Sequence, residues 1–286
     1  MKPEFVILKN KNLEVVLSTL GASIFQILFH NENMVLTPVN DEDYQKINLY
    51  YGKTIGRVAG RIELNGLIQD NDNGLSLHGG FDGISTKYFD YHLKDNVVEF
   101  QCISPDGEAG YPGNFVLYVR YELLEDSLLV NYTATVDKPC LVFLTNHAYF
   151  CLGEASTNKL SLQFKSTRKI VHDDRVFSLY EDNVPEQYDF SSPKILGQCG
   201  NIDDYFILDD PKVKLISTKF EMTIESNFLG LQMFTDHFFD GIKVLTSQSD
   251  LYRAVALEPE DNPLKREELL PGQKYERSIK YTFKKL

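Results

Sequence analysis

The feature that most constrains the fold is an alternation of apolar and polar side chains with a period of two residues. Along residues 115–123 one face carries Phe, Leu, Val, Tyr and Leu, and the other carries Val, Tyr, Arg and Glu. This pattern is typical of a half-buried β-strand. A second alternating run follows at residues 128–136 after a short polar turn at 125–127. Two such runs around a tight turn predict an antiparallel hairpin.

The same period recurs along the whole chain, whereas helical periodicity is weak. Further strand candidates are residues 5–8, 13–17, 97–102, 160–164, 220–224, 254–258 and 275–283. Only 41–47 and 266–270 favour a turn or two of helix. No linker, charge block or internal repeat divides the 286 residues. We therefore expect one all-β domain over residues 1–286, a large antiparallel β-sandwich with very little helix.

Charge and composition limit the classes of partner. A formal net charge of -12 disfavours nucleic acid and anionic membrane surfaces. No apolar run reaches the roughly 18 residues that span a bilayer, and residues 1–8 lack the features of a signal peptide. None of the four cysteines forms a C-x-x-C pair, so reduced thiols in the cytoplasm are expected. The expected partner is a small neutral or cationic molecule, bound by a monomer or a homodimer.

Seven segments interrupt the alternation and are rich in Gly, Pro, His or acidic residues. They are residues 55–62, 75–80, 104–113, 144–152, 202–208, 230–235 and 256–263. We expect them to be loops between strands, and loops on a rigid sheet are where functional sites usually lie.

Two histidines within these segments are candidate proton donors or acceptors. His78 precedes two glycines, which let the backbone approach a neighbour closely, and His147 is flanked by apolar and aromatic residues. Desolvation at such positions moves an imidazole pKa. The alternative is that each is a buried histidine bonded to the backbone. No two histidines lie three to five residues apart and H-E-x-x-H is absent, so no metal site is predicted.

Glu258 is the candidate general base, because a carboxylate at the end of a buried strand is partly desolvated. It closes the apolar run 254–258, and Pro259 is expected to end the strand there. Two alternatives stay open: a solvated acidic loop, or a glycosidase acid pair formed by Glu258 and Glu260. Neither G-x-S-x-G nor a glycine-rich phosphate loop is present.

Taken together, these segments resemble the galactose mutarotase (aldose 1-epimerase) family. Residues 55–62 are similar to its G-R-x-A-N-R-I and 77–80 match its L-H-G-G. Residues 104–113 resemble S-x-D-G-E…G-Y-P-G, and 145–150 resemble T-N-H-S-Y-F. Residues 230–232, 257–259 and 271–275 resemble G-x-Q, L-E-[TP] and P-G-x-x-Y. The matches keep the family's order from about residue 21 to 283, so the resemblance implies a galactose mutarotase-like supersandwich.

The resemblance also implies a reaction and roles for residues. His147 would protonate the ring oxygen of an unphosphorylated aldose, such as galactose or glucose, and Glu258 would take the proton of the C1 hydroxyl. His78 would help to hold the ring oxygen and C1 region. Arg61, Asp204 and Gln232 would bind sugar hydroxyls. Ring opening by an acid and a base requires neither a metal nor a redox cofactor.

This chain departs from the family pattern at positions that bear on substrate preference. Gly60 replaces the usual Asn, Asp204-Tyr205 replaces Asp-His, and Glu260 stands near a typical Gln. Two further alternatives follow. A hexose-6-phosphate epimerase would use Arg57 and Arg61 as a phosphate clamp, and a catalytically silent carbohydrate-binding module would keep the fold alone.

Overall fold

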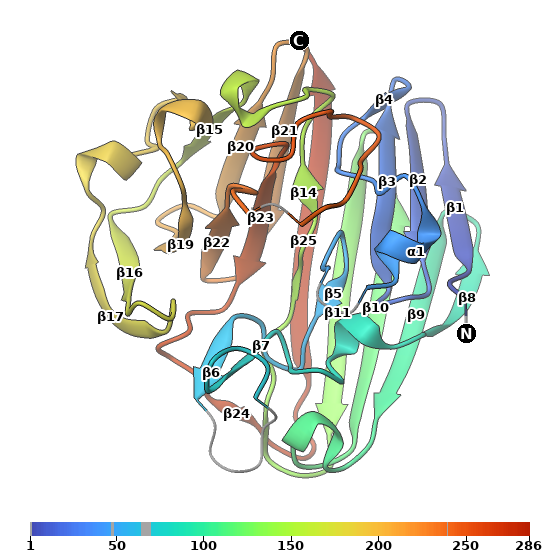
Figure 1. Ribbon diagram of the computed structural model, residues 1–286. Coiled ribbons are helices and arrows are strands. Elements are labelled where there is room, and N and C mark those ends of the chain that lie inside the picture. Colours follow the sequence, from blue (N-terminus) through green and yellow to red (C-terminus); the bar gives the residue numbers. More distant parts are fainter. Residues whose placement is uncertain (1, 47–48, 64–69, 239) are drawn as a thin grey trace.

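A computed structural model describes residues 2–46, 49–63, 70–238 and 240–286. Its largest element is an antiparallel sheet of nine strands (Figure 1). In spatial order these are β18 (Lys194–Ile195), β15 (Ser161–Phe164), β20 (Lys212–Ile216), β21 (Phe220–Ser226), β25 (Tyr275–Lys285), β11 (Ser127–Val136), β10 (Phe115–Leu123), β9 (Val97–Ser104) and β8 (Asp90–Lys94). The predicted hairpin is confirmed, because Phe115 of β10 pairs with Val136 of β11 and Leu123 pairs with Leu128.

Two further sheets form the second layer. The six-stranded sheet runs β14 (Tyr149–Phe150), β23 (Val255–Glu260), β22 (Gly230–Phe234), β19 (Asp203–Ile207), β16 (Arg168–His172) and β17 (Ser178–Asn183). The four-stranded sheet runs β1 (Phe5–Lys9), β2 (Leu13–Ser18), β3 (Ser23–Phe29) and β4 (Glu32–Asn33). Three short pairs complete the strands: β12 (Cys140–Leu141) with β24 (Glu268–Leu269), β13 (Thr145–Asn146) with β5 (Thr54–Ile55), and β6 (Arg61–Glu63) with β7 (Leu75–Leu77).

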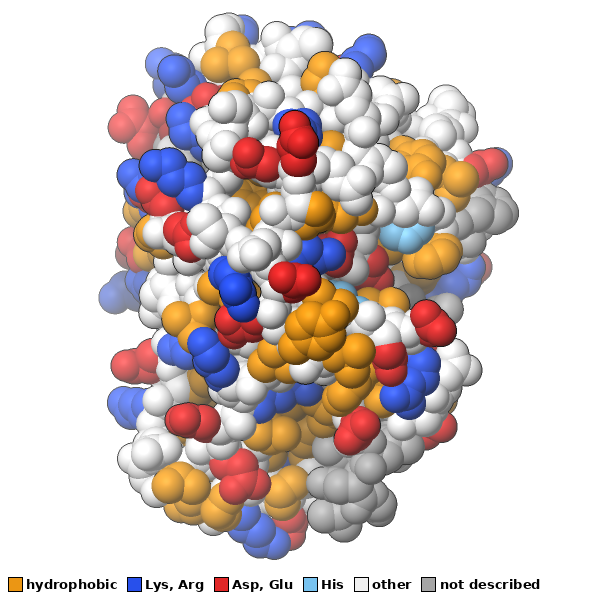
Figure 2. Space-filling model, turned by 90° about the vertical axis from the view of Figure 1, so that its left-hand side faces the viewer, with side chains coloured by type: hydrophobic (Ala, Val, Ile, Leu, Met, Phe, Trp, Pro, Cys, Tyr) orange, Lys and Arg blue, Asp and Glu red, His pale blue; other side chains and the backbone are white. Residues whose placement is uncertain are grey.

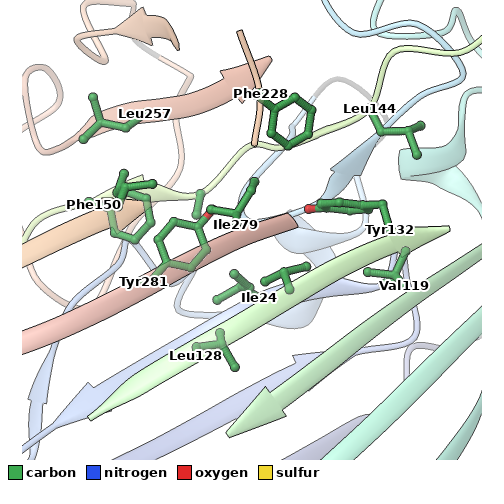
Figure 3. Packing of buried hydrophobic residues seen from close by; sticks show 14 of the residues in the cluster. Ile24, Val119, Leu128, Tyr132, Leu144, Phe150, Phe228, Leu257, Ile279 and Tyr281 are labelled. Atoms are coloured by element: carbon green, nitrogen blue, oxygen red, sulfur yellow. The ribbon is translucent and has the colours of Figure 1, made fainter. Parts of the chain in front are cut away.

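The core lies between the nine-stranded sheet and the other two. Phe29 of β3 contacts Phe220 of β21 and Phe283 of β25, with ring centroids 5.7 Å apart in both pairs. The rings of Phe150 of β14 and Tyr281 of β25 have centroids 5.2 Å apart. Both side chains are labelled in Figure 3. One cluster of buried apolar side chains therefore joins all three sheets, and the predicted all-β antiparallel sandwich is confirmed.

Helix is scarce in the described residues. One α-helix, α1 (Asp41–Tyr44), occupies part of the predicted 41–47 segment, whose Ile47 lies outside the described residues. The single-turn 3-10 helices are η1 (Ile84–Thr86), η2 (Glu108–Gly110), η3 (Thr157–Lys159), η4 (Glu186–Tyr188) and η5 (Leu196–Gln198). The helix expected at 266–270 is wrong, because Glu268 and Leu269 form β24 and pair with Cys140 and Leu141.

Most of the segments expected to be loops contain strand residues, and three of them are largely strand, which decides how the site is built. Residues 230–234 are β22, residues 203–207 are β19, and β23 runs to Glu260. All six residues of β23 are buried, so no polar face is left to produce an alternating pattern.

Pro259 does not end its strand, contrary to expectation. It lies inside β23, opposite Leu231 of β22. On the other side, β14 pairs with β23 only at Val255 and Ala256. The edge beside Pro259 therefore needs no ladder hydrogen bond to β14, and a proline is tolerated in such a position. As a result Glu258 and Glu260 both belong to a rigid, buried strand.

Candidate active site

A cavity of about 270 Å³ opens on the six-stranded sheet. Side chains of every colour class meet around a hollow in this face in Figure 2. The ionisable groups that line the cavity are Arg61, His78, His147, His172, Asp203, Asp236, Asp240, Glu258, Glu260 and Arg266. Half of them lie on the strands β6, β16, β19 and β23, so rigid strands position these groups, and the others lie outside strands.

His147 and Glu258 are in contact inside this cavity. His147 Nε2 lies 3.4 Å from Glu258 Oε1, and the residues are 5% and 1% exposed. His147 sits between β13 and β14, where its N–H donates to the Lys53 carbonyl and its carbonyl accepts from the Gly52 N–H, both at 3.0 Å. Glu258 is held in β23 opposite Gln232 of β22. Residues 111 positions apart in the chain are thereby brought to one point.

Aromatic rings enclose the His147 imidazole. Tyr50 stacks on it with centroids 5.5 Å apart, Tyr149 lies at 5.0 Å, and the His78 ring meets it edge-on at 5.3 Å. Their burial of the imidazole lowers the pKa of His147 to about 4. Tyr50 and Tyr149 were not predicted as site residues. Tyr149 lies within the 145–150 motif beside His147, and Tyr50 lies a few residues before the segment 55–62.

Burial acts on the Glu258 carboxyl in the opposite direction. Desolvation raises its pKa well above 4.5, and the nearby acids Glu260 and Asp203 raise it further. Desolvation therefore favours the uncharged form of both groups, with a proton on the Glu258 carboxyl rather than on the His147 imidazole. Glu258 Oε2 and His147 Nδ1 are buried without a hydrogen-bond partner among the described residues. A bound ligand could satisfy such atoms.

His78 lies beside this pair in a strained backbone conformation, with φ of +53°. Its Nδ1 accepts a hydrogen bond from the Gly60 N–H at 3.3 Å, which leaves the proton of a neutral ring on Nε2. Burial, followed by the charges of His147 and Arg61, holds the pKa of His78 well below 6.5. Gly79 permits the close turn, because a Cβ there would lie 2.0 Å from the Gly56 carbonyl oxygen. His78 is thus a neutral donor.

Arg61 and Gln232 line the same cavity, each with a partner that orients it. Arg61 Nε donates to Asp72 Oδ2 at 2.6 Å. Gln232 Nε2 donates to Asp203 Oδ1 at 2.7 Å. Charged and amide groups held in this way can bind hydroxyl groups in fixed orientations.

Asp204 was predicted to bind a sugar hydroxyl, but it is not among the residues that line the cavity, whereas its neighbour Asp203 is. Successive side chains of a strand point to opposite faces, and β19 turns Asp203 and Tyr205 toward the cavity. Asp204 instead pairs with Lys169 on β16. Burial raises the pKa of Asp203.

Arg57, a candidate phosphate ligand by sequence, serves the fold instead. Its guanidinium is buried and donates to the Ser104 carbonyl at 2.9 Å and to the Pro105, Pro112 and Gly113 carbonyls at 3.0 Å each. None of these residues lines the cavity. The segment 104–113 is therefore a support for Arg57 rather than part of the site.

A second buried network closes the cavity wall. Arg253 is fully buried and donates through Nε and Nη2 to the two oxygens of Asp236 at 2.7 and 2.9 Å. It also pairs with Asp240, which accepts a hydrogen bond from Tyr51. Tyr51 in turn contacts Tyr149 at 5.2 Å. This network, which the sequence did not reveal, supports Tyr149, one of the rings that enclose His147.

A metal site and a membrane-spanning helix are both absent from the described part of the chain. Within it, no cluster of three or more His, Cys, Asp or Glu side chains has the arrangement of a metal site. Nor does it contain a helix with the length and apolar character that a membrane crossing needs.

The fold, an antiparallel β-sandwich with a polar cavity on its six-stranded sheet, is that of galactose mutarotase-like proteins, as two solved structures show. An aldose epimerase homologue from C. elegans superposes with a TM-score of 0.91 over 99% of both chains, at 24% identity. The galactose 1-epimerase of Lactobacillus acidophilus NCFM superposes with a TM-score of 0.89 over 100% of this chain and 99% of that chain, at 26% identity.

The chain belongs to the aldose 1-epimerase family, whose model matches residues 4–282. Human galactose mutarotase is 31% identical over 231 residues, which cover 70% of this chain and 66% of the human protein. The aldose 1-epimerase of Escherichia coli K12 is 33% identical over 193 residues, covering 60% of this chain and 53% of that protein. The chain thus spans just under two thirds of the human relative in this match.

Proposed function

We propose that this chain is an aldose 1-epimerase, a mutarotase that interconverts the α and β anomers of an unphosphorylated aldose such as galactose or glucose. The observation that carries the proposal is the contact between His147 and Glu258 at 3.4 Å in a cavity lined by hydroxyl-binding groups. Family membership supports the same reaction class.

Mutarotation needs one proton to arrive at the ring oxygen and another to leave the C1 hydroxyl. Both oxygens are bonded to C1, so an acid and a base that are themselves in contact can reach them together. His147 is the proposed acid at the ring oxygen and Glu258 the proposed base at the hydroxyl. Each such group contributes roughly 10²–10⁴-fold.

Ring opening requires the proton to be on His147 when it begins. Burial, in contrast, favours a proton on Glu258. Transfer between Oε1 and Nε2 supplies the reactive arrangement without a proton from solvent. A sugar hydroxyl that donates to Glu258 stabilises its ionised form, and the carboxylate then favours the imidazolium. After the C1–ring oxygen bond breaks, rotation of the aldehyde and reversed proton transfers close the other anomer.

Binding groups around the pair would fix the ring in place. His78 offers its Nε2–H to the ring oxygen and C1 region, while Arg61, Asp203 and Gln232 bind ring hydroxyls. All of them line the cavity. Holding the reacting atoms in this way reduces the entropy cost of the proton transfers.

A phosphorylated sugar is a poorer fit. Arg57 is committed to carbonyl groups outside the cavity, and Arg61 is paired with Asp72. Five acidic side chains line the cavity against two arginines: Asp203, Asp236, Asp240, Glu258 and Glu260 against Arg61 and Arg266. A phosphate dianion would be repelled by this excess of carboxyl groups.

Polarimetry on freshly dissolved α-D-galactose and α-D-glucose tests the proposal. The expected result is faster decay of optical rotation than in buffer alone, in proportion to protein concentration. Glu258→Gln should retain the fold by circular dichroism and lose at least about 100-fold in kcat. Wild-type protein that binds the sugars without accelerating the decay is a carbohydrate-binding module, and unchanged kcat in the variant removes Glu258 from its role. Release of nitrophenol from nitrophenyl glycosides would instead favour a glycosidase.

A further inference from the structure

Glu260 is a buried carboxyl group that the proposed reaction does not use. It is 3% exposed and lines the cavity two residues beyond Glu258 on β23, so both side chains point to the same face of the strand. Among the described residues, no hydrogen bond or ion pair to its carboxylate is found within bonding distance. The charge of Arg266 acts on this carboxyl without a hydrogen bond between the two side chains. A ligand that donates a hydrogen bond to the carboxyl would offset the cost of its burial.

A donor lies on the other side of the same space. Arg266 also lines the cavity, where Nη1 donates to the Arg61 carbonyl at 2.9 Å and the guanidinium lies 5.7 Å from the centre of the Phe143 ring. These contacts fix the guanidinium in place. Its Nε is buried without a hydrogen-bond partner among the described residues.

Gly60 creates the space between these two groups. Among the described residues, a Cβ placed on Gly60 would meet only Glu260 Oε1, at a tight 3.3 Å that the end of this flexible side chain must relieve, and Arg266 Nη2, at 3.8 Å. The absence of a side chain here therefore opens a recess, next to Glu258, with a hydrogen-bond acceptor and a hydrogen-bond donor on its walls.

An acceptor and a donor that face one small recess match a secondary amide, which carries an N–H and a C=O side by side. An ammonium group would be repelled by Arg266, and an anionic group by Glu260. A hydroxyl on the same ring carbon can also donate to Glu260 or accept from Arg266, but it is a single oxygen atom, whereas the N–H and C=O of an acetamido group lie on neighbouring atoms and can serve both groups at once. Because unsatisfied buried groups are costly, a site built this way discriminates in favour of the ligand that pairs both.

We propose that Gly60, Glu260 and Arg266 form a subsite for the acetamido group of an N-acetylated amino sugar, attached to the ring carbon next to the anomeric carbon. The amide N–H donates to Glu260, the amide oxygen accepts from Arg266, and the methyl group fills the recess over Gly60. This proposal rests on the proposed mutarotase function, because Glu258 places the anomeric carbon beside the recess.

The test compares two acetamido sugars with their parent hexoses. Mutarotation of N-acetylglucosamine, N-acetylgalactosamine, glucose and galactose is followed by polarimetry. We expect kcat/KM for at least one acetamido sugar to equal or exceed that of its parent. Calorimetric binding of the same sugars to Glu258→Gln gives a readout that does not depend on catalysis.

Gly60→Asn is the discriminating variant. Gly60 has a φ of +67°, a conformation that asparagine tolerates better than other side chains, so the amide should fill the recess with limited strain. The ratio of kcat/KM for the acetamido sugar to that for its parent should fall by about tenfold or more. Gly74→Asn is the matched control, because Gly74 has a φ of +88°, no atom of a described residue lies within 4 Å of a Cβ there, and it is not among the cavity-lining residues.

The outcomes separate the two proposals. If all four sugars mutarotate at the buffer rate but acetamido sugars bind Glu258→Gln more tightly than their parents, the mutarotase function fails and the subsite stands. If the parents are substrates and the acetamido sugars react and bind at least tenfold less well, the subsite is overturned. An unchanged ratio in folded Gly60→Asn also overturns it. Should Gly60→Asn not fold, Arg266→Met must lower the same ratio.

Discussion

A single proton shared by His147 and Glu258 connects the burial of these residues to their chemistry. Desolvation lowers the pKa of the imidazole to about 4 and raises that of the carboxyl well above 4.5. Between these two values the pair carries one proton and is uncharged overall. At a pH below the pKa of His147 the pair gains a second proton. At a pH above the raised pKa of Glu258 it loses its only proton. The proposed reaction requires the form with one proton.

The pH dependence of kcat/KM should therefore be bell-shaped. The acid limb falls near pH 4, where His147 is protonated while Glu258 is still neutral, and the alkaline limb falls at the raised pKa of Glu258. Polarimetry corrected for buffer catalysis measures both limbs. A profile without an acid limb near pH 4, or without any alkaline limb, would contradict the pair. Glu260, whose pKa burial raises to about 7, is the competing source of an alkaline limb. Because we assign the alkaline limb to Glu258, we expect Glu260→Gln to keep this limb. Its loss in Glu260→Gln would assign the limb to Glu260 instead.

The site residues found from sequence are those that belong to contiguous motifs. His78, His147, Arg61, Gln232 and Glu258 all line the cavity. The rings that desolvate them were missed. Tyr50 belongs to no motif, and the motif that contains Tyr149 assigned it no role, because packing against an imidazole depends on where two distant turns meet and not on spacing along the chain. The recess at Gly60 is equally invisible without its neighbours Glu260 and Arg266.

At the scale of single elements, strand parity decides which acid of β19 faces the cavity. The sequence resemblance assigned the role to Asp204, one position from Asp203, and a shift of one residue in a strand moves a side chain to the opposite face. Motif comparison cannot resolve such a shift when two aspartates are adjacent. The hydrogen bond between Asp203 and Gln232 settles which of them faces the cavity.

Because Asp203 and Asp204 point to opposite faces of β19, the same substitution at each should have different effects on activity. Asp203→Asn should lower kcat/KM for the aldose by about 10–100-fold, because a charged acceptor for a sugar hydroxyl is lost. Asp204→Asn, on the opposite face, should change kcat/KM by less than about threefold. Steady-state polarimetry on both variants measures the contrast. Equal losses in the two variants would show that parity has been assigned incorrectly.

The loop 104–113 gives a second prediction at this scale. Arg57 reaches into it and satisfies four carbonyl groups, at Ser104, Pro105, Pro112 and Gly113. Arg57→Met should reduce the free energy of unfolding by about 3–5 kcal/mol, because these groups lose a buried charged partner. Arg175→Met, whose side chain is 46% exposed, should cost less than about 1 kcal/mol. Guanidinium denaturation measures both. A loss of activity without a loss of stability in Arg57→Met would favour a role at the site.

For the molecule as a whole, the alternating strands fixed the fold class while the fully buried strands escaped sequence analysis. The hairpin β10–β11 and the face of β25 that carries Tyr275, Ile279, Tyr281 and Phe283 were expected, because each strand has one buried and one polar face. Strand β23 is covered on both faces and gives no such signal. Since this strand holds Glu258 and Glu260, the part of the fold that is hardest to predict is the part that builds the site.

Stability and the proposed activity should oppose each other at this site, and the opposition should depend on pH. Burial raises the pKa of Glu258 well above 4.5 and that of Glu260 from 4.5 to about 7. Each folded-state value lies above the unfolded one, so the folded state binds the proton more tightly. The stability linked to these protons is complete below about pH 4.5 and is lost as the pH rises through the raised values.

Glu258→Gln should therefore raise the Tm at pH 8 and change it little at pH 5. The amide cannot ionise, so the cost of burying a charge at alkaline pH is removed, a gain of about 1–2 kcal/mol. That corresponds to a Tm increase of roughly 2–8 °C in a chain of this size. Thermal unfolding at the two pH values measures it, with Glu225→Gln as an exposed control. An equal Tm gain at pH 5 and pH 8 would mean that the wild-type carboxyl destabilises the fold through its packing. Ionisation of the buried Glu258 would then not be the cause.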